Sequence, residues 1–336
     1  MKIIAFVNNN SGPAYHRVIA PLMLMNGVDV YITNNLLEED FKDGCDIFMY
    51  NRIIPDHCAE MLARLKERHG FKTCVDVDDY WHLDREHILH DFYDEYEYAN
   101  QQIWHIKNAD IVTTTHDRLA EKIKEFNPNV HVLPNAIPKR GQFDIERQAH
   151  HLTRLFWQGS ITHGPDINLL QRPMECLQDI SKQIKMVMAG FMEEDEWYKM
   201  LMDYTAKTKH QYQILPGVNV NEYYQHYAHA DICLIPLLNS TFNQHKSNLK
   251  VLEAANLGLP VICSPVHPYI GLPVVYAAGT KGWITNIKKM VASKRYQKEA
   301  GQELKEYCEL HYNFDKINKE RKQIFEYETS KQTVLR

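Results

Sequence analysis

Residues 243–264 read NQHKSNLKVLEAANLGLPVICS, and this stretch decides the expected fold. Its apolar side chains recur at helical spacing over residues 247–257, which predicts one short helix with a buried face. Gly258 fits the position that ends a helix, and Pro260 prevents the helix from continuing. The apolar run 261–263 is typical of a buried strand in a parallel sheet. The stretch therefore predicts a helix, a tight turn and a central strand of an α/β domain.

Polar residues at the start of this helix indicate an anion site. A helix N-terminus presents unpaired N–H groups and the positive end of the helix dipole. Ser247 and Asn248 add side-chain donors there, and Lys246 and Lys250 are close enough to lean toward a diphosphate. Glu253 lies about two turns from Lys246, where a carboxylate can accept from two ribose hydroxyls. A solvated face with ordinary caps would explain the lysines alone, but not the whole stretch.

The segments LEA at 252–254 and GLPVI at 258–262 resemble the C-terminal nucleotide-sugar motif of GT-B-type glycosyltransferases, in particular glycosyltransferase family 4, or group 1. In that family a Glu-x7-Glu motif opens this helix. The first Glu contacts the transferred sugar and the second contacts the ribose. Glu253 matches the second Glu, whereas His245 stands in place of the first. The resemblance therefore implies a ribose contact for Glu253, and His245 is a further donor-side candidate.

Strand and helix signals alternate along the whole chain. Strands are expected at residues 3–7, 28–33, 45–50, 73–77, 111–114 and 130–133, and again at 154–157, 184–189, 212–215, 231–236 and 261–263. Strands separated by helices imply parallel, doubly wound sheets. The expected fold class is α/β, with two Rossmann-like doubly wound domains that face a cleft, as in the GT-B architecture.

A proline-containing segment, LPNAIP at residues 133–138, resembles the end of the first domain in that family and makes a stiff exit. We expect an acceptor-side domain at residues 1–138, a linker at 139–152 and a nucleotide-sugar-binding domain at 153–311. The resemblance further implies that a helix at about 314–328 packs back on the first domain. A solvated terminal helix is the alternative.

The loop after the first strand is placed at the cleft, because functional loops of parallel sheets follow the carboxyl ends of strands. Its sequence, SGPAYHR at 11–17, lacks the Gly-x-Gly-x-x-Gly dinucleotide fingerprint. It still resembles the Gly-containing loop that faces donor and acceptor in GT-B enzymes. Gly12 and Arg17 are therefore expected at the donor. His16 is a candidate catalytic residue, with a helix-surface role as the alternative.

Asp78 and Asp79 follow the fourth strand, in the segment DVDDYW at 76–81. An Asp-x-Asp motif holds a divalent metal in the other large glycosyltransferase fold, GT-A. The surroundings here are Rossmann-like, so we expect no metal and interpret both carboxylates as acceptor-side catalytic candidates, with a helix cap as the alternative. Residues 82–105, rich in His, Tyr, Glu and Asp, are expected to form an amphipathic helix beside the acceptor groove.

Two loops of the second half complete the predicted donor site. Gly159 and Ser160 follow a strand and precede a helix, which suits a phosphate cradle. Family 4 carries an Arg and a Lys in this region, whereas this chain offers Ser160 and His163, so Lys246 and Lys250 must supply the charge. Gly217 and Val218 are expected to contact the nucleobase through their backbone.

Composition excludes several classes of protein. Hydrophobic residues make up 44% and charged residues 24%, as in soluble globular domains. No apolar run approaches the roughly 18 residues of a membrane helix, and the first residues do not read as a signal peptide. Seven cysteines without a Cys-x-x-Cys pair favour a reducing cytoplasm, or the host cytoplasm for a viral protein. The 18 histidines are dispersed, without zinc spacing.

The formal charge of −5 is unevenly distributed. Residues 1–138 hold 13 Lys and Arg against 22 Asp and Glu, and residues 139–336 hold 25 against 21. An acidic first half disfavours a polyanionic partner there, and a positive second half suits a small anionic ligand.

These features predict a hexosyl- or pentosyltransferase that moves a sugar from a nucleotide-diphosphate sugar, a UDP-sugar first, to an acceptor hydroxyl. We expect no metal and no other cofactor, and the resemblance implies retention of anomeric configuration. The expected acceptor is a glycan or a lipid-linked glycan. One alternative is glycosylation of a modified base in DNA by a virus-type enzyme. The other is a non-catalytic nucleotide-sugar-binding protein or an epimerase.

Overall fold

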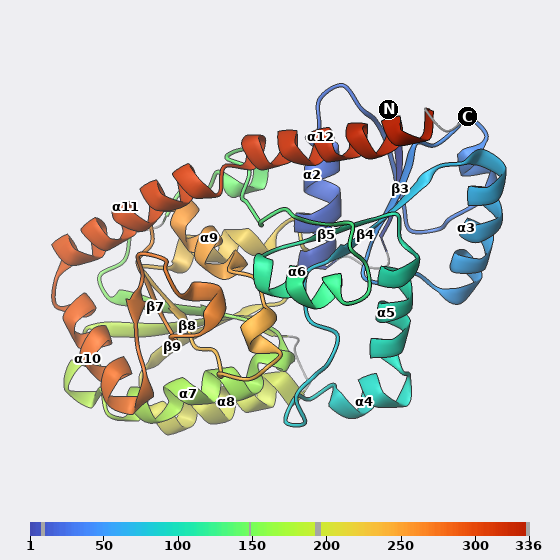
Figure 1. Cartoon of the computed structure of the whole chain (residues 1–336). Helices are drawn as coiled ribbons and strands as arrows, with labels where there is room; N and C mark the ends of the chain where they lie inside the picture. The colour runs from blue at the N-terminus through green and yellow to red at the C-terminus, as the bar shows by residue number, and fades with distance from the viewer. Residues whose placement is uncertain (8–10, 148, 192–195, 334–336) are drawn as a thin grey trace.

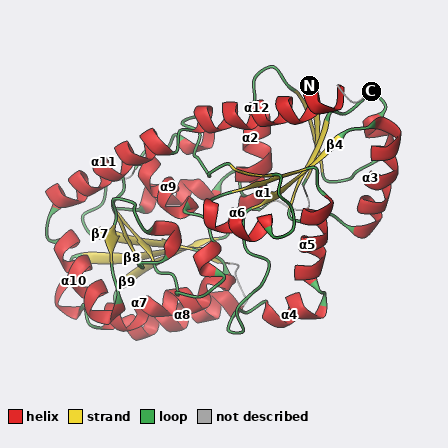
Figure 2. Cartoon of the chain, viewed as in Figure 1, coloured by secondary structure: helices red, strands yellow, loops and turns green. Residues whose placement is uncertain are grey.

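The computed structural model describes residues 1–7, 11–147, 149–191 and 196–333. Two α/β domains lie beside each other, and each is built on its own parallel sheet (Figures 1 and 2). The first sheet contains β1 (Lys2–Phe6), β2 (Asp29–Thr33), β3 (Ile47–Asn51), β4 (Lys72–Val77), β5 (Ile111–Thr114) and β6 (Val130–Val132). Its strand order is β2-β1-β3-β4-β5-β6, so the chain winds outward in both directions from the β1–β3 pair.

The second sheet has the same construction. It contains β7 (Thr153–Gln158), β8 (Ile184–Phe191), β9 (Gln211–Pro216), β10 (Ile232–Ile235), β11 (Val261–Cys263) and β12 (Val275–Tyr276). The order is β12-β11-β10-β7-β8-β9, which reverses beside β7. In doubly wound sheets a ligand crevice opens at such a reversal, outside the carboxyl ends of the strands.

Helices cover both faces of the first sheet because they carry apolar residues at helical spacing. In α3 (Asp56–His69), Cys58, Leu62 and Leu65 face the core. The other first-domain elements are α1 (Gly12–Ala14), the π-helical turn η1 (Tyr15–Ile19), α2 (Ala20–Met23), η2 (Glu38–Phe41), α4 (His90–Glu95), α5 (Tyr98–Asn108) and α6 (Asp117–Lys124). The linker contains the short turn η3 (Gly141–Phe143).

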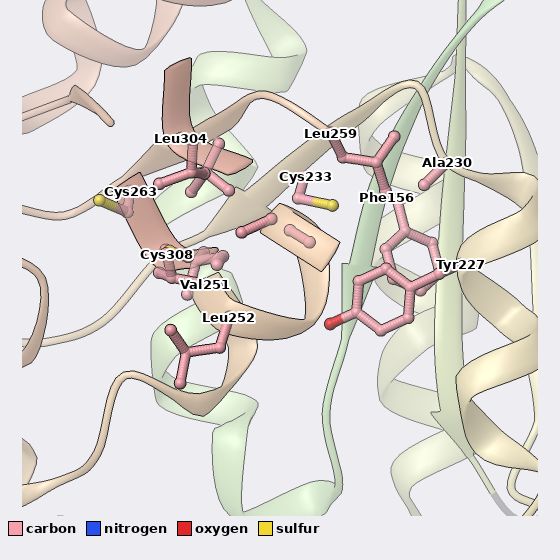
Figure 3. Close-up of a cluster of buried hydrophobic side chains, with 14 of the residues drawn as sticks. Phe156, Tyr227, Ala230, Cys233, Val251, Leu252, Leu259, Cys263, Leu304 and Cys308 are labelled. Carbon is pink, nitrogen blue, oxygen red and sulfur yellow. The ribbon is translucent and has the colours of Figure 1, made fainter. Parts of the chain in front are cut away.

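The helix at the centre of the sequence argument is α9 (Leu249–Asn256), inside the expected range 247–257. Val251 and Leu252 lie in one buried cluster with Cys233 of β10 and Phe156 of β7 (Figure 3). Gly258 ends the turn after α9 with φ +63°, a conformation that glycine adopts without strain. The predicted helix, turn and buried strand are therefore present.

The remaining second-domain elements surround this unit. They are η4 (Ile161–His163), α7 (Gly164–Glu175), η5 (Gln178–Ile180), α8 (Glu196–Thr208), η6 (Tyr223–His229), η7 (Asn243–His245), η8 (His267–Tyr269), α10 (Gly279–Val291) and α11 (Lys294–His311). Within the described ranges, no helix has the length and apolar content needed to cross a lipid bilayer.

The last helix, α12 (Phe314–Thr333), leaves the second domain and lies along the first (Figure 1). Phe325 is fully buried in the core formed by β1, β3 and η1. Asn318 donates to the carbonyl of Pro21 at 2.9 Å, and Lys322 donates to the carbonyl of Asn26 at 2.9 Å. The end of the described chain is thus part of the domain that holds its beginning.

Most expected strands are observed within one or two residues of their predicted bounds, and β5 and β11 match them in full. The helix expected over residues 82–105 is wrong for 82–89, which form loop and turns before α4 and α5. Contacts with the second domain explain the difference: Asp84 accepts from the backbone N–H of Phe242 at 3.0 Å, and His87 packs edge-on against the Phe242 ring. The strand β12 was not expected. Residues 8–10, at the start of the loop after the first strand, lie outside the described residues.

Candidate functional site

A cavity opens between the two domains at the carboxyl ends of the second sheet. Its volume is about 350 Å³, within the range of small-molecule sites, and it is open to solvent. Seven of the predicted donor residues line it: Gly12, Gly159, Ser160, His163, Gly217, Val218 and Lys250. Only Gly12 comes from the first domain. The structure therefore brings these seven predicted residues together at one cavity.

Two glycines keep one wall of the cavity free of side chains. Gly190, the next-to-last residue of β8, has φ +99°, and a Cβ there would lie 2.6 Å from the carbonyl oxygen of Gly159. The two strand ends therefore approach backbone to backbone. Any larger residue at position 190 would push the Gly159–Ser160 turn away and change the shape of the cavity.

Lys250 is the residue that brings positive charge into this cavity. Its Nζ donates to the carbonyl of Gln158 at 3.0 Å. Burial, and next the charge of Lys246, lower the pKa of Lys250 to about 8. The side chain is thus cationic at neutral pH and is poorly solvated. An anion in the cavity would restore the electrostatic stabilisation that water no longer supplies.

His163 lies beside Lys250 but carries no charge. Its Nδ1 lies 2.9 Å from Asp166 Oδ2. Burial, followed by the charges of Lys246 and Lys250, lowers the pKa of His163 to about 3. The neutral ring is therefore fixed by Asp166, and the phosphate cradle has no imidazolium. Of the two lysines expected to supply the charge, Lys250 lines the cavity.

Lys246, Ser247 and Asn248 do not line the cavity, and their expected donor contacts are absent from this arrangement. Burial lowers the pKa of Lys246, while Asp79 of the first domain and Asp166 of the second raise it. Its Nζ lies 5.0 Å from the centre of the Phe242 ring. The charge of Lys246 is therefore stabilised electrostatically by carboxylates of both domains.

The start of α9 makes contacts that the sequence did not predict. Ser247 Oγ accepts from Asn135 Nδ2 of the first domain at 2.8 Å. The side chain of Asn248 interacts with Tyr312, and not with the first backbone N–H groups of the helix. The two side chains expected to hold a diphosphate thus stabilise the domain interface and the end of α11.

Glu253 is buried and its carboxylate is occupied. Tyr223 donates to Oε1, and Tyr227 donates to Oε2 at 2.7 Å. Gln158 Nε2 lies 3.5 Å from Oε2. Burial raises the pKa of Glu253 to about 7, although both tyrosine hydroxyls act in the opposite direction. In this arrangement the tyrosines take the place that ribose hydroxyls were expected to fill, and a ribose contact stays a prediction.

Arg17 is misplaced in the sequence-based site. Its guanidinium forms a bidentate ion pair with Asp76, with distances of 2.8 to 3.2 Å, inside the first domain. It also donates to the carbonyl of Leu133 at 2.7 Å and to Asn135 Oδ1 at 3.0 Å. With its donors bound to the protein and 1% of the side chain exposed, Arg17 does not point into the cavity. Its position after a loop suggested a ligand contact, but a carboxylate on β4 satisfies it.

His16 reaches the second domain instead of an acceptor. Its Nε2 lies 2.6 Å from the Tyr223 hydroxyl and 3.7 Å from Glu253 Oε1. Burial, and next the charge of Arg17, lower the pKa of His16 to about 3. Its Nδ1 has no hydrogen-bond partner among the described residues. The helix-surface alternative is wrong, since 4% of the residue is exposed.

Asp78 and Asp79 form a cluster with Arg52. The guanidinium of Arg52 contacts both oxygens of Asp78, at 2.7 and 2.8 Å, and Asp79 Oδ2 at 2.8 Å. Burial opposes the ionisation of Asp78, but Arg52 outweighs it and lowers the pKa of that carboxyl. Arg52 adopts φ 59°, which is uncommon outside glycine and indicates a locally fixed backbone. Neither carboxylate lies at the donor cavity, and their catalytic role is still a prediction.

A second cavity, of about 180 Å³, lies next to this cluster at the carboxyl edge of the first sheet. Its lining includes Ser11, Pro13, Asn51, Arg52 and Tyr98. It is thus formed by the loops after β1 and β3, and belongs wholly to the first domain.

His245 packs away from both cavities. Its ring stacks on Tyr80 of the first domain with centroids 4.6 Å apart. Its carbonyl accepts from His116 at 3.0 Å. The expected donor contact of His245 is therefore corrected to a contact between domains.

Sequence reasoning missed Tyr223, Gln158 and Gly190 as cavity residues. Tyr223 belongs to η6, whose sequence YYQHYAH gives no motif that separates its tyrosines. Only the fold shows that Tyr223 lines the cavity while Tyr224 and Tyr227 are packed inside.

Comparison with known proteins supports this architecture. Residues 154–294 match the family model described as Glycosyl transferases group 1. No curated protein matches the chain in sequence. WaaG, described as a glycosyltransferase involved in lipopolysaccharide biosynthesis, superposes with a TM-score of 0.64 at 12% identity, over 97% of this chain and 99% of WaaG.

Two structures with bound ligands are also similar. A TarM variant from S. aureus, in complex with Fondaparinux, alpha-GlcNAc-glycerol and UDP, has a TM-score of 0.60 at 12% identity, over 83% of this chain and 55% of TarM. The pneumococcal O-GlcNAc transferase GtfA, in complex with UDP and GlcNAc, has a TM-score of 0.56 at 14% identity, over 84% of this chain and 56% of GtfA. The chain thus spans little more than half the length of these two proteins. The expected fold class, two Rossmann-like domains in the GT-B arrangement, is confirmed.

Proposed function

We propose that this chain, whose residues 154–294 resemble the group 1 glycosyl transferases, moves a sugar from a nucleotide-diphosphate sugar to an acceptor hydroxyl. The observation that carries the proposal is the cavity between the domains. It combines a glycine-bordered turn, Gly159–Ser160, with the poorly solvated cation Lys250 at the carboxyl ends of a doubly wound sheet.

In this proposal the donor takes one orientation in the cavity. The diphosphate lies at the Gly159–Ser160 turn and Lys250, where the local charge is positive. The base lies at Gly217 and Val218, where the lining is backbone and apolar side chain. UDP is the first nucleotide to test, because the TarM and GtfA structures contain it.

Transfer requires negative charge to build up on the leaving diphosphate while the sugar carbon becomes cationic. Lys250 and the backbone N–H groups of the turn stabilise that charge from fixed positions. Both oxygens of Asp78 and one oxygen of Asp79 are bound by Arg52, so this pair of carboxylates is a poor candidate for a metal site. The proposed reaction therefore uses no metal and no cofactor besides the donor.

Retention of anomeric configuration is part of the proposal. The family resemblance implies it, and the described residues that line the donor cavity include no Asp or Glu. The lack of a carboxylate counts against retention through a covalent intermediate, so the resemblance alone supports retention. Proton NMR of the first-formed product compares its anomeric coupling with that of the donor. An inverted product would overturn this point.

The acceptor is proposed to be a glycan or a lipid-linked glycan that enters from the first domain. The cavity beside Arg52 is suited to hydroxyl groups, because Asn51, Ser11 and Tyr98 line it. The single Arg52 cation is already matched by two carboxylates, and the domain is acidic overall. A polyanion such as DNA would be repelled, which disfavours the modified-base alternative. The free cysteines suit a reducing compartment such as the cytoplasm.

Titration calorimetry with UDP, GDP and ADP tests the donor site. We expect one nucleotide to bind the wild type, and Lys250→Met to weaken it by at least about tenfold because a desolvated charge partner is lost. Lys246→Met is the matched control, since Lys246 lies outside the cavity, and a smaller effect is expected. Equal affinity of the wild type and Lys250→Met would reject the site.

An epimerase or a binding protein is separated from a transferase by one further assay. The donor is incubated with the protein alone, and its sugar is followed by NMR. A transferase gives at most slow hydrolysis, whereas an epimerase converts the sugar without an acceptor. Conversion without an acceptor would overturn the proposed reaction while leaving the donor site intact.

A further inference from the structure

Three side chains from both domains meet at the edge of the donor cavity. His16 comes from η1 in the first domain, Tyr223 from η6 and Glu253 from α9 in the second. The Tyr223 hydroxyl lies 2.6 Å from His16 Nε2 and also contacts Glu253 Oε1. A single hydroxyl thus joins the loop after β1 to the helix that carries Lys250.

The order of donors along this line follows from valence. A hydroxyl has one proton, and a carboxylate only accepts. When Glu253 is ionised, Tyr223 therefore donates to Glu253 and accepts from His16, which requires the proton of the neutral imidazole to be on Nε2. The remaining nitrogen, Nδ1, is the one without a partner among the described residues. The chain of bonds has one direction, from the first domain to the second.

Tyr223 and Tyr227 form a natural comparison. Both hydroxyls donate to Glu253, one to each oxygen. Tyr223 also lines the donor cavity and contacts His16. Tyr227 instead packs against Phe156 in the second-domain core, with ring centroids 4.9 Å apart (Figure 3). Each of the two tyrosines therefore makes one hydrogen bond to Glu253, but Tyr223 also contacts the first domain through His16.

We propose that Tyr223 is a positioning residue: its hydroxyl links His16 to Glu253 and holds the two domains in the arrangement that completes the donor cavity. A ligand in that cavity contacts the Tyr223 ring, so occupancy of the cavity and closure of the domains reinforce each other. The ligand part rests on the proposed function, whereas the link between the domains does not.

Hydrogen–deuterium exchange of the ligand-free protein tests the link directly. In Tyr223→Phe we expect amides of residues 11–19 to exchange about 2- to 10-fold faster, the equivalent of one lost hydrogen bond. Tyr227→Phe is the control: it should speed exchange in α9 and leave residues 11–19 unchanged. Equal exchange in residues 11–19 for the wild type and Tyr223→Phe, or equal acceleration by both variants, would overturn the proposal.

Substitution of His16 gives a second test that depends on chemistry rather than on size. His16→Gln places an amide N–H near the position of Nε2 and should keep exchange near the wild-type rate. His16→Asn cannot reach that position and should behave like Tyr223→Phe. If residues 11–19 exchange as fast in His16→Gln as in His16→Asn, His16 acts only by packing, and the link is rejected.

UDP binding adds the ligand arm. Tyr223→Phe should lower the affinity for UDP about 2- to 10-fold in calorimetry. This loss corresponds to the hydrogen-bond energy that no longer stabilises the closed arrangement of the domains. UDP should in turn slow exchange of residues 11–19 in the wild type. If the wild type binds none of the nucleotides, the proposed function fails, and the exchange results still decide the role of Tyr223.

Discussion

Asn135 of the first domain donates a hydrogen bond to Ser247 of the second, with 2.8 Å between Nδ2 and Oγ. The same amide accepts from Arg17, which is paired with Asp76 on β4. The start of α9 is therefore connected to a buried ion pair in the middle of the first sheet. The helix that was expected to bind a diphosphate with its first residues uses one of them to contact the other domain.

Asn135 donates to Ser247 and accepts from Arg17, and substitution of Ser247 or of Asn135 itself separates the effects of these two hydrogen bonds. Ser247→Ala removes only the bond between domains and should cost about 1 kcal/mol of unfolding free energy. Asn135→Ala also leaves one N–H of Arg17 without its acceptor and should cost roughly 2–3 kcal/mol. Urea denaturation measures both. If the two variants are equally stable, the Arg17 contact adds nothing.

Arg17 should matter for stability and not for donor binding. Arg17→Met leaves Asp76 buried without its cation, which costs about 3–5 kcal/mol. UDP affinity, measured by calorimetry at a temperature where the variant is folded, should stay within about twofold of the wild type because Arg17 does not reach the cavity. A large loss of affinity with unchanged stability would restore the donor role suggested by the sequence.

Binding of UDP should weaken in alkaline solution. The free protein holds the pKa of Lys250 at about 8, and a bound diphosphate favours the protonated form. Above that pH binding must take up a proton, so the affinity should fall by up to about tenfold per pH unit. Calorimetry between pH 7 and 9 in buffers of different ionisation enthalpy measures the uptake. Lys250→Met should bind weakly with little uptake, and an unchanged uptake in that variant would assign the proton to another group.

Glu253 should make the protein more stable in mildly acidic solution. Its pKa is about 7 in the folded state, against an ordinary 4.5. A raised carboxyl pKa stabilises the native state below pH 4.5, and this contribution is lost as the pH rises to about 7, a change of roughly 3 kcal/mol. Glu253→Gln should flatten that slope in urea denaturation, whereas Glu303→Gln on the exposed face of α11 should not. A slope that persists in Glu253→Gln would locate the titration elsewhere.

The α12 contact predicts a sharp difference between two neighbouring aromatic residues. Phe325 is fully buried against the first sheet, and Tyr327 is 61% exposed. Phe325→Ala should cost about 3–5 kcal/mol, and Tyr327→Ala should change stability by less than about 0.5 kcal/mol. Thermal and urea denaturation compare the two. Similar losses would mean that α12 is held by its exposed face.

Local patterns carried the prediction of the fold. The α9–β11 unit was predictable because its helical spacing, its terminating Gly258 and its apolar strand all lie within 22 residues. The two-residue strand β12 was missed because two residues show no alternation. The loop at 82–89 was read as helix because its contact with Phe242 lies about 160 residues away in the sequence.

The cavity-lining residues could be predicted from the sequence where their position depends on the course of the backbone. Gly159 and Gly217 line the cavity because strand ends place them there whatever their partners, and Lys250 lines it from the first turn of α9. Arg17 and His245 were assigned to the donor because position in a loop gives no information on where a side chain points. Their partners, Asp76 and Tyr80, are distant in sequence and belong to the packing between elements.

Because α12 returns to the first domain, the chain passes between the two domains twice, and the second domain is inserted between these two crossings. The crossings lie together: Lys139 pairs with Glu309, and Arg140 with Asp315 at 3.2 Å. A domain that is joined by two neighbouring chain segments rotates mainly about the axis that passes through both segments. Rotation about either segment alone is restricted by the other. Such a hinge would bring the same faces of the two sheets together on every closure, so that registry between donor and acceptor is set by the covalent path of the chain.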